Sequence, residues 1–192
     1  MKMIIIDLEM NQPSNKIIDI GAYLVDLKRK SFLSKFDSLC NPGELPSDYI
    51  LQNGLTITQL TGITPEMVAS AEASNVVHDR FWRWVEECKV GGVIGAWGGD
   101  IQVIKRESTE LGVTVIPKIQ DYDLKKLTSF FRAARGGKTK GGLSNSMDLF
   151  SVKKHGPAHR ALIDAENTSL LMFELFSKLQ KMFQIEDILK ES

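Results

Sequence analysis

The first ten residues, MKMIIIDLEM (1–10), contain an apolar run that ends in two carboxylates. The run predicts a buried strand, in which residues i and i+2 point to the same face of the sheet. Asp7 and Glu9 therefore project together, and Leu8 points the other way. Two like charges at this spacing repel each other, and burial raises the cost. A hard divalent cation would offset this repulsion, because such ions prefer carboxylate oxygens. The alternative is that the strand ends at Asp7 and both acids are solvated.

The overall composition is that of a soluble globular protein. The chain has 192 residues, of which 43% are hydrophobic and 25% are charged, which is typical of one domain. The formal net charge is zero, so any contact with nucleic acid must be local. The apolar run at the start is too short for a signal peptide, and no segment reaches the apolar length of a membrane span. We expect a cytoplasmic protein that does not bind membranes, with Cys40 and Cys88 as reduced thiols.

Apolar or alternating segments predict five strands, at 2–9, 16–27, 31–40, 91–97 and 113–119. The short polar turn between the second and third strands indicates a hairpin. The strand at 91–97 is apolar on both faces, which is typical of a central parallel strand. Pro117 has no N–H to donate, so the strand at 113–119 is expected at an edge of the sheet.

Helical periodicity predicts the helical segments 75–89, 99–112, 123–134, near 143–153, and 160–182. A further short helix is expected at Pro65, with Thr64 as its N-cap. His78 is expected on the surface of the helix at 75–89. Three strands followed by alternating helices and strands indicate an α/β layer structure, with an antiparallel hairpin attached to a partly parallel sheet. We expect one domain over 1–183 and a C-terminal tail over 184–192.

Two further acids, Asp164 and Asp100, occupy positions that either a structural or a functional role could explain. Asp164 lies on the apolar stripe of the last helix, where an unpaired charge is costly. The alternative is that it stays wet and favours the positive end of the helix dipole. Asp100 follows the strand at 91–97 and can act as a helix N-cap. It also falls at the carboxyl end of a parallel strand, where ligands bind in open α/β sheets.

One histidine stands beside these acids. His159 lies in a loop five residues before Asp164, whereas His155 has no comparable context. A histidine can accept a proton near neutral pH, so His159 is a candidate general base.

The stretches "DLE" (7–9), "GAWGGD" (95–100) and "HRALIDA" (159–165), in this order, resemble the three motifs of the DEDDh exonucleases, the DnaQ-like branch of the ribonuclease-H-like superfold. The resemblance extends from residue 4 to about 175. Each motif alone is weak, and the ordered set is specific. The resemblance implies a ribonuclease-H-like three-layer fold, in which helices flank a mixed five-stranded sheet. The residues that match the motifs are Asp7, Glu9, Asp100, His159 and Asp164.

The resemblance also implies an activity, which is hydrolysis of the 3′-terminal phosphodiester of single-stranded nucleic acid with release of nucleoside 5′-monophosphates. Two divalent ions would be the cofactors, and Mg²⁺ or Mn²⁺ suits a site whose ligands are all oxygens. In this interpretation Asp7 bridges both ions, Glu9 and Asp164 complete their shells, and Asp100 acts partly through water. His159 takes the proton from the attacking water.

The sequence leaves the substrate open. "AWGGD" (96–100) resembles the branch that trims histone-mRNA 3′ ends and small RNAs, which favours RNA. A DNA-directed proofreading or repair exonuclease is the alternative. A non-catalytic nucleic-acid-binding module on the same fold is a third possibility. A fourth is an unrelated α/β protein with structural acids, which predicts no effect of metal on stability or activity.

Several residues are candidates for gripping the substrate. No acid lies between Asp123 and Asp148, whereas that interval contains the basic residues Lys125, Lys126, Arg132, Arg135, Lys138 and Lys140. Lys138 and Lys140, in a glycine-rich loop, could follow a phosphate backbone, or they could simply be solvated. The resemblance makes Met10 a candidate contact for the terminal base, with ordinary packing as the alternative. Trp97 could stack on a base, although filling the core is favoured because it closes a buried strand.

Overall fold

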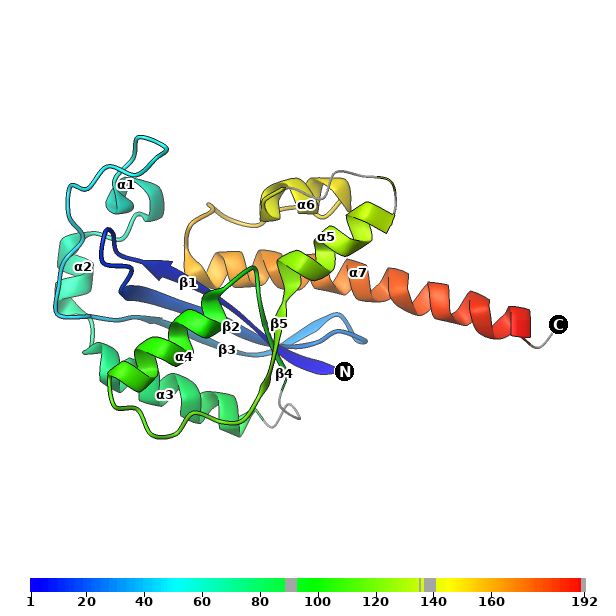
Figure 1. Ribbon diagram of the computed structural model, residues 1–192, viewed down its shortest axis with the longest axis horizontal. Helices are drawn as coiled ribbons and strands as arrows, with labels where there is room; N and C mark the ends of the chain where they lie inside the picture. Colours follow the sequence, from blue (N-terminus) through cyan, green and yellow to red (C-terminus); the bar gives the residue numbers. More distant parts are fainter. Residues whose placement is uncertain (89–92, 135, 137–140, 191–192) are drawn as a thin grey trace.

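The computed structural model describes residues 1–88, 93–134, 136 and 141–190. A five-stranded mixed sheet lies between two layers of helices, as expected (Figure 1). The strand order is β3-β2-β1-β4-β5. β1 is antiparallel to β2, β2 is antiparallel to β3, and β4 is parallel to both β1 and β5. The strands are β1 (Lys2–Met10), β2 (Ile17–Asp26), β3 (Ser31–Leu39), β4 (Val93–Ala96) and β5 (Gln120–Asp123).

Except for α1, which was not predicted, the helices lie close to the predicted segments. They are α1 (Ile57–Thr61), α2 (Pro65–Ser70), α3 (Ser74–Glu87), α4 (Asp100–Glu110), α5 (Leu124–Ala134), α6 (Leu143–Leu149) and α7 (Ala161–Lys190). The Thr64 side chain caps α2 and Pro65 is its first residue, which confirms that prediction. α7 continues past 182 because its sequence contains no glycine or proline to end it.

The position of the fifth strand was predicted wrongly. The expected strand at 113–119 is not in the sheet, and β5 begins at Gln120. Its partner is β4, with Val93 opposite Gln120 and Ala96 opposite Asp123. Pro117 cannot donate to a strand ladder, so the pairing begins only after it. The strand that does form, β5, lies at an edge of the sheet.

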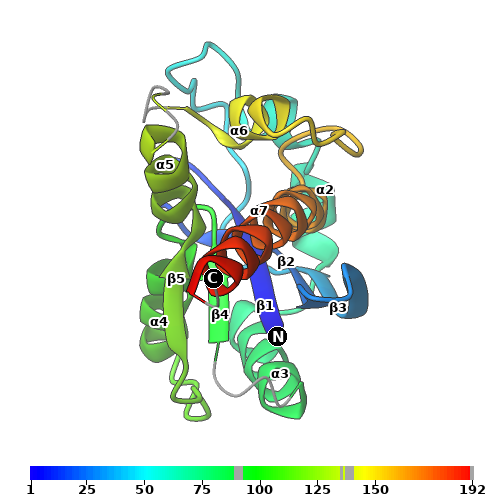
Figure 2. The same ribbon diagram turned by 90° about the vertical axis from the view of Figure 1, so that its right-hand side faces the viewer.

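β1 separates two hydrophobic clusters, one on each face of the sheet. Ile4 and Ile6 pack on the face covered by α3 and α4. Met3 and Ile5 pack on the opposite face, together with residues of α7. Figure 2 shows α7 crossing that face over β1 and β2. The alternation places the side chains that follow Met3 and Ile5 on odd numbers, Asp7 and Glu9, on the α7 face.

A glycine lets α7 approach the sheet closely. A Cβ on Gly21 of β2 would lie 2.0 Å from the backbone nitrogen of Leu162 and 2.2 Å from the carbonyl carbon of Ala161. Both atoms belong to the first turn of α7, so any side chain at position 21 would push this turn away. Gly21 pairs with Asp7 across the ladder, so the close approach occurs beside the first motif acid.

The far end of α7 runs beyond the body of the protein (Figure 1). The helix continues from Ala161 to Lys190 through the boundary at 183, and the division into a domain and a tail stays a prediction. No helix in the described part of the chain is long and apolar enough to cross a bilayer.

Candidate active site

The first two candidate ligands lie at the end of β1. Asp7 and Glu9 are half-buried, and both lie beyond the last residue pair of β1 with β4, which is Ile6 with Ala96. β1 therefore continues past the carboxyl end of its parallel neighbour. The two side chains project on the α7 face at the edge where α4 and α7 both begin.

Asp100 reaches the same edge from β4. It is the first residue of α4, whose N-cap is Gly99, and the helix has no side-chain cap. The explanation of Asp100 as the N-cap is therefore wrong. Its carboxylate instead accepts a hydrogen bond from the backbone of Leu8 on β1.

The third motif places His159 and Asp164 on the two sides of the start of α7. Asp164 is half-buried in the first turn, and its Oδ2 accepts the backbone N–H of His159 at 2.8 Å. His159 has a positive φ of 66°, and its side chain is exposed. Glu9, His159 and Asp164 each offer a ligand atom within 4.8 Å of the others, which is a spacing that can hold a metal ion.

Burial and mutual repulsion disfavour the charged forms of these acids. Burial raises the pKa of Asp7 well above its ordinary value, and the carboxylates of Asp100, Glu9 and Asp164 raise it further. Burial likewise raises the pKa of Glu9 to about 8 and that of Asp100 to about 6. The pKa of Asp164 is also raised, chiefly by burial. Like charges held this close favour protonation unless a cation joins them.

Positive charge from the described residues is limited: Arg160 lowers the pKa of Glu9, but by less than burial and the neighbouring acids raise it. Within the described residues, no Lys or Arg side chain forms an ion pair with Asp7, Glu9, Asp100 or Asp164. All four offer only carboxylate oxygens, the donors that Mg²⁺ and Mn²⁺ prefer. The set therefore fits divalent metal ions.

A cleft of about 550 Å³ opens onto this cluster. Asp7, His159 and Asp164 line one side of it. The other lining residues come mainly from α5, α6 and the loop before α7, and they include Trp97, Lys125, Ser144, Met147 and Lys154. Two exposed lysines beside four acids make the cleft suitable for an anionic ligand bound next to metal ions.

The predicted substrate contacts have different positions. Trp97 is half-buried, lines the cleft and packs against the cluster on the α7 face. Met10 is half-buried and packs against the cluster on the α3–α4 face. Lys138 and Lys140 lie outside the described residues. Contact of these four side chains with a substrate stays a prediction.

Sequence reasoning missed an ion pair next to the cluster, between a buried carboxylate and a partly exposed arginine. Asp19 of β2 is 1% exposed, and its Oδ2 lies 3.2 Å from Nε of Arg160 and 3.4 Å from the backbone nitrogen of Ala161. Burial raises the pKa of Asp19 to about 6 although Arg160 lowers it. The available signal was an acid within the apolar stretch "KIIDIG" (16–21).

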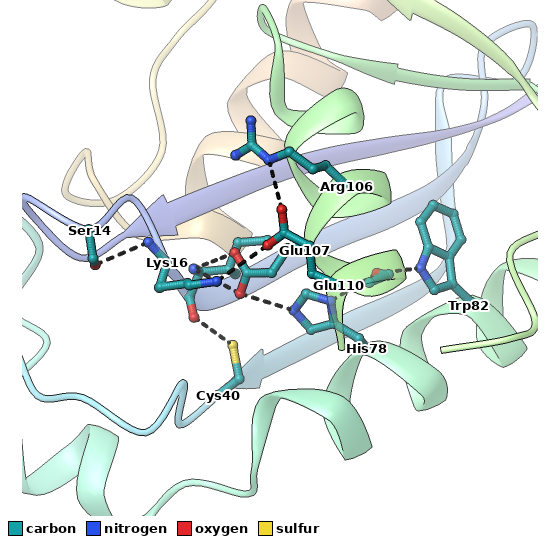
Figure 3. A network of polar contacts seen from close by, with 10 residues as sticks. Ser14, Lys16, Cys40, His78, Trp82, Arg106, Glu107 and Glu110 are labelled. Atoms are coloured by element: carbon teal, nitrogen blue, oxygen red, sulfur yellow. Dashed lines mark hydrogen bonds and ion pairs between the residues drawn. The ribbon is translucent and has the colours of Figure 1, made fainter. Parts of the chain in front are cut away.

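A second polar network lies on the opposite face of the sheet (Figure 3). His78 is fully buried, so its predicted surface position is wrong. Its Nδ1 lies 2.9 Å from the Ser108 hydroxyl, which also accepts Trp82 Nε1–H at 2.8 Å. Glu107 accepts the Ile17 backbone N–H at 3.2 Å and lies 3.9 Å from His78 Nε2. The helical pattern hid this position because the faces of α3 and α4 that meet also carry polar side chains.

Solved structures share this fold. The chain superimposes on cell-death related nuclease 4 (CRN-4) with a TM-score of 0.75 at 15% identity, over 92% of this chain and 64% of that one. It superimposes on the nuclease domain of 3′hExo, a DEDDh family member bound to rAMP, with a TM-score of 0.70 at 18% identity, over 92% of both chains. For E. coli Exonuclease I in complex with a dT13 oligonucleotide the TM-score is 0.62 at 15% identity, over 96% of this chain and 43% of that one. The chain thus spans less than two thirds of the length of CRN-4.

Sequence comparison gives the family. No curated protein sequence matches the chain. The model of the RNase_T exonuclease family matches residues 4–172, which contain all three motifs. The chain therefore belongs to the RNase_T exonuclease family, and its motif set is that of the DEDDh branch.

Proposed function

We propose that the protein is a metal-dependent 3′–5′ exonuclease that acts on single-stranded nucleic acid, favours RNA and releases nucleoside 5′-monophosphates. The observation that carries this proposal is the meeting of four carboxylates and His159 beside a cleft, with no Lys or Arg of the described chain paired to the acids. A structural role for these acids would leave most of their mutual repulsion without compensation, because Arg160 offsets only a small part of it at Glu9.

The acids would hold two divalent ions, Mg²⁺ or Mn²⁺. Asp7, at the centre of the repulsion, is the candidate bridging ligand. Glu9 and Asp164 would complete the shells, and Asp100, at the start of α4, would act partly through water. Bound in pairs, such ions stabilise both the attacking and the leaving oxygen of a phosphoryl displacement.

His159 would act as the general base. Its ring lies in the cleft wall beside Glu9 and Asp164, where it can take a proton from the water that attacks phosphorus. The bond between phosphorus and the 3′ oxygen of the penultimate nucleotide then breaks, and that oxygen takes up a proton from solvent water. Lys125 and Lys154, in the same cleft, would contact the phosphates of the strand.

The preference for RNA is supported by the likeness of "AWGGD" to the branch that trims histone-mRNA 3′ ends. The structural neighbours include a histone-mRNA stem-loop 3′-exonuclease. DNA is the second candidate substrate, because other neighbours were solved with dT13 or with duplex DNA that has a 5′ overhang.

The test uses purified protein and matched RNA and DNA oligonucleotides labelled at either end. Each is incubated with Mg²⁺, Mn²⁺ or EDTA, beside Asp7→Asn. We expect metal-dependent shortening from the 3′ end that is faster on RNA and absent in the variant. Equal or faster cleavage of DNA would overturn the RNA preference. No cleavage of either polymer by folded protein would favour a binding module.

A further inference from the structure

An ion pair between a buried carboxylate and a partly exposed arginine connects β2 to the residue next to the candidate general base. Asp19 Oδ2 accepts Arg160 Nε–H at 3.2 Å and the Ala161 backbone N–H at 3.4 Å. Asp19 is 1% exposed, whereas the Arg160 side chain is 34% exposed. Ala161 begins α7, so Asp19 satisfies one of the free N–H groups of this helix from a different element.

The register of the sheet places this contact beneath the active site. Asp19 lies opposite Glu9 in the β1–β2 ladder, and Gly21 lies opposite Asp7. Opposed residues of an antiparallel ladder point to the same face. β2 therefore presents to α7 a carboxylate that binds the start of the helix and a glycine that leaves room for it.

The backbone at His159 needs such a support. Its φ of 66° is a left-handed conformation that a residue other than glycine rarely adopts, and the surrounding contacts must hold it. One contact is the hydrogen bond from its N–H to Asp164 Oδ2. The other is the attachment of the next two residues, Arg160 and Ala161, to Asp19.

Stability alone is a weak explanation for this pair. Only the Asp19 carboxylate is buried, and its attraction to the partly exposed Arg160 does not fully offset the cost of burying it, because its pKa stays raised to about 6. Oδ1 of Asp19 is buried and has no hydrogen-bond partner among the described residues, so the arrangement is not optimised for stability.

We propose that Asp19, acting through Arg160 and the Ala161 N–H, is a positioning residue that fixes the start of α7 so that His159 and Asp164 face Asp7 and Glu9. The proposal rests on the proposed function. Asp19 touches neither the substrate nor the reacting water in this scheme. Its contribution is the orientation of the two residues of the third motif.

The experiment compares Asp19→Asn, Arg160→Gln and their double variant with Glu107→Gln. Glu107 is a matched control, because it is also a buried carboxylate that accepts a backbone N–H at the start of β2, on the other face of the sheet. We expect each single variant to lower kcat by about 10- to 100-fold with KM little changed, as for residues that orient metal ligands. The double variant should lose no more kcat than the more impaired single variant, because each substitution removes the same Asp19–Arg160 interaction. Glu107→Gln should keep kcat within about twofold when all proteins are assayed well below their Tm.

Hydrogen exchange gives a readout that does not depend on activity. We expect amide exchange in peptides that cover 157–164 to speed up in Asp19→Asn and Arg160→Gln and to stay unchanged in Glu107→Gln. Arg160→Lys, which keeps the charge, should restore part of the protection and part of kcat.

Two results would overturn the proposal. One is exchange and kcat of Asp19→Asn equal to those of Glu107→Gln. The other is an Asp19→Asn protein that is no longer stabilised by Mn²⁺, measured as a Tm shift, although its amide exchange at 157–164 is unchanged. That result would make Asp19 a metal ligand. Wild-type protein that cleaves no oligonucleotide would refute the proposed function instead, and faster exchange in the variants would still establish the contact.

Discussion

The acid cluster on the α7 face and the His78 network on the α3–α4 face both contain buried titratable groups on the same sheet. They differ in how far neighbouring residues stabilise those groups. In the His78 network, most of the polar atoms are hydrogen bonded: Ser108 Oγ lies between His78 Nδ1 and Trp82 Nε1, and Glu107 accepts the backbone N–H of Ile17 (Figure 3). His78 Nε2 has no hydrogen-bond partner among the described residues and lies 3.9 Å from Glu107. In the acid cluster, Asp7 is destabilised in its charged form by three other motif carboxylates.

The difference separates a structural polar site from a functional one. A polar group that serves only the fold is expected to be satisfied by the fold, because an unpaired buried group costs about 1–3 kcal/mol. A cluster whose repulsion the described chain offsets only in part, through Arg160, is complete only with a ligand. Removing its acids should therefore reduce activity without reducing the stability of the metal-free protein, and removing groups of the His78 network should do the reverse.

The largest effect is expected from Asp7→Asn. This change removes the negative charge on which the repulsion converges and leaves a neutral amide, which is a weaker ligand for divalent ions. We expect kcat to fall by about a thousandfold or more while Tm in EDTA stays equal or rises. Initial rates and thermal melts measure both. A folded variant with near wild-type activity would remove Asp7 from the catalytic site.

His159→Ala should lower kcat by about a hundredfold or more, the usual contribution of a general base. Its exposed side chain supports no core packing, so Tm should change little. Stabilisation by Mn²⁺ should persist, because the four carboxylates remain. If His159→Ala is no longer stabilised by Mn²⁺, the role of His159 would be to bind metal and not to transfer a proton.

Ser108→Ala tests the opposite face. The variant leaves the Trp82 Nε1–H and His78 Nδ1 without their shared hydroxyl. We expect it to lower the free energy of unfolding by about 2 kcal/mol, measured by urea denaturation, and to keep kcat within about twofold below its Tm. A large loss of kcat in folded protein would mean that the two faces are coupled.

The pH dependence of stability tests the acid cluster through Glu9. The pKa of Glu9 is raised from 4.5 to about 8 in the folded protein. Folded protein therefore keeps a proton that the unfolded chain releases, and the stability of the metal-free protein falls as pH rises from about 4.5 to about 8. Glu9→Gln cannot ionise, so in EDTA its Tm should exceed that of the wild type at pH 8.5 and match it near pH 4.5. Equal curves for the two proteins would contradict the shift.

Mn²⁺ should counter this loss in the wild type. Metal binding requires the ionised carboxylates, so protons compete with the ion at low pH. The rise in Tm on adding Mn²⁺ is therefore expected to be larger at pH 8 than at pH 6. It should be small at both values in Glu9→Gln.

The smallest effect is expected from Lys125→Ala. Lys125 is exposed and lines the cleft, so its loss should raise KM a few-fold and leave kcat unchanged. The slope of log KM against log salt concentration should also decrease, by about the amount that one phosphate contact contributes. Lys28→Ala, in the turn between β2 and β3, is the matched control and should change none of these. An unchanged KM in Lys125→Ala would remove this lysine from the proposed path of the strand.

The sequence by itself predicted the strands β1 to β4, every described helix except α1, and the five motif residues as the candidate site. Period-2 alternation puts Asp7 and Glu9 on one face whatever the partner strands are. The spacing from His159 to Asp164 spans a helix start, and the order of the three motifs fixes which elements must meet. These are local properties, and the chain carries them without its tertiary structure.

Only the tertiary structure decided where the fifth strand pairs, that His78 is buried, and that Asp19 reaches the start of α7. Pairing of β5 depends on the neighbouring β4, and burial of His78 depends on α4, whose Ser108 lies 30 residues further along the chain than His78. Asp19 and Arg160 are 141 residues apart. Contacts of this kind arise when separate elements pack together, and they leave no periodic pattern in the sequence of either one.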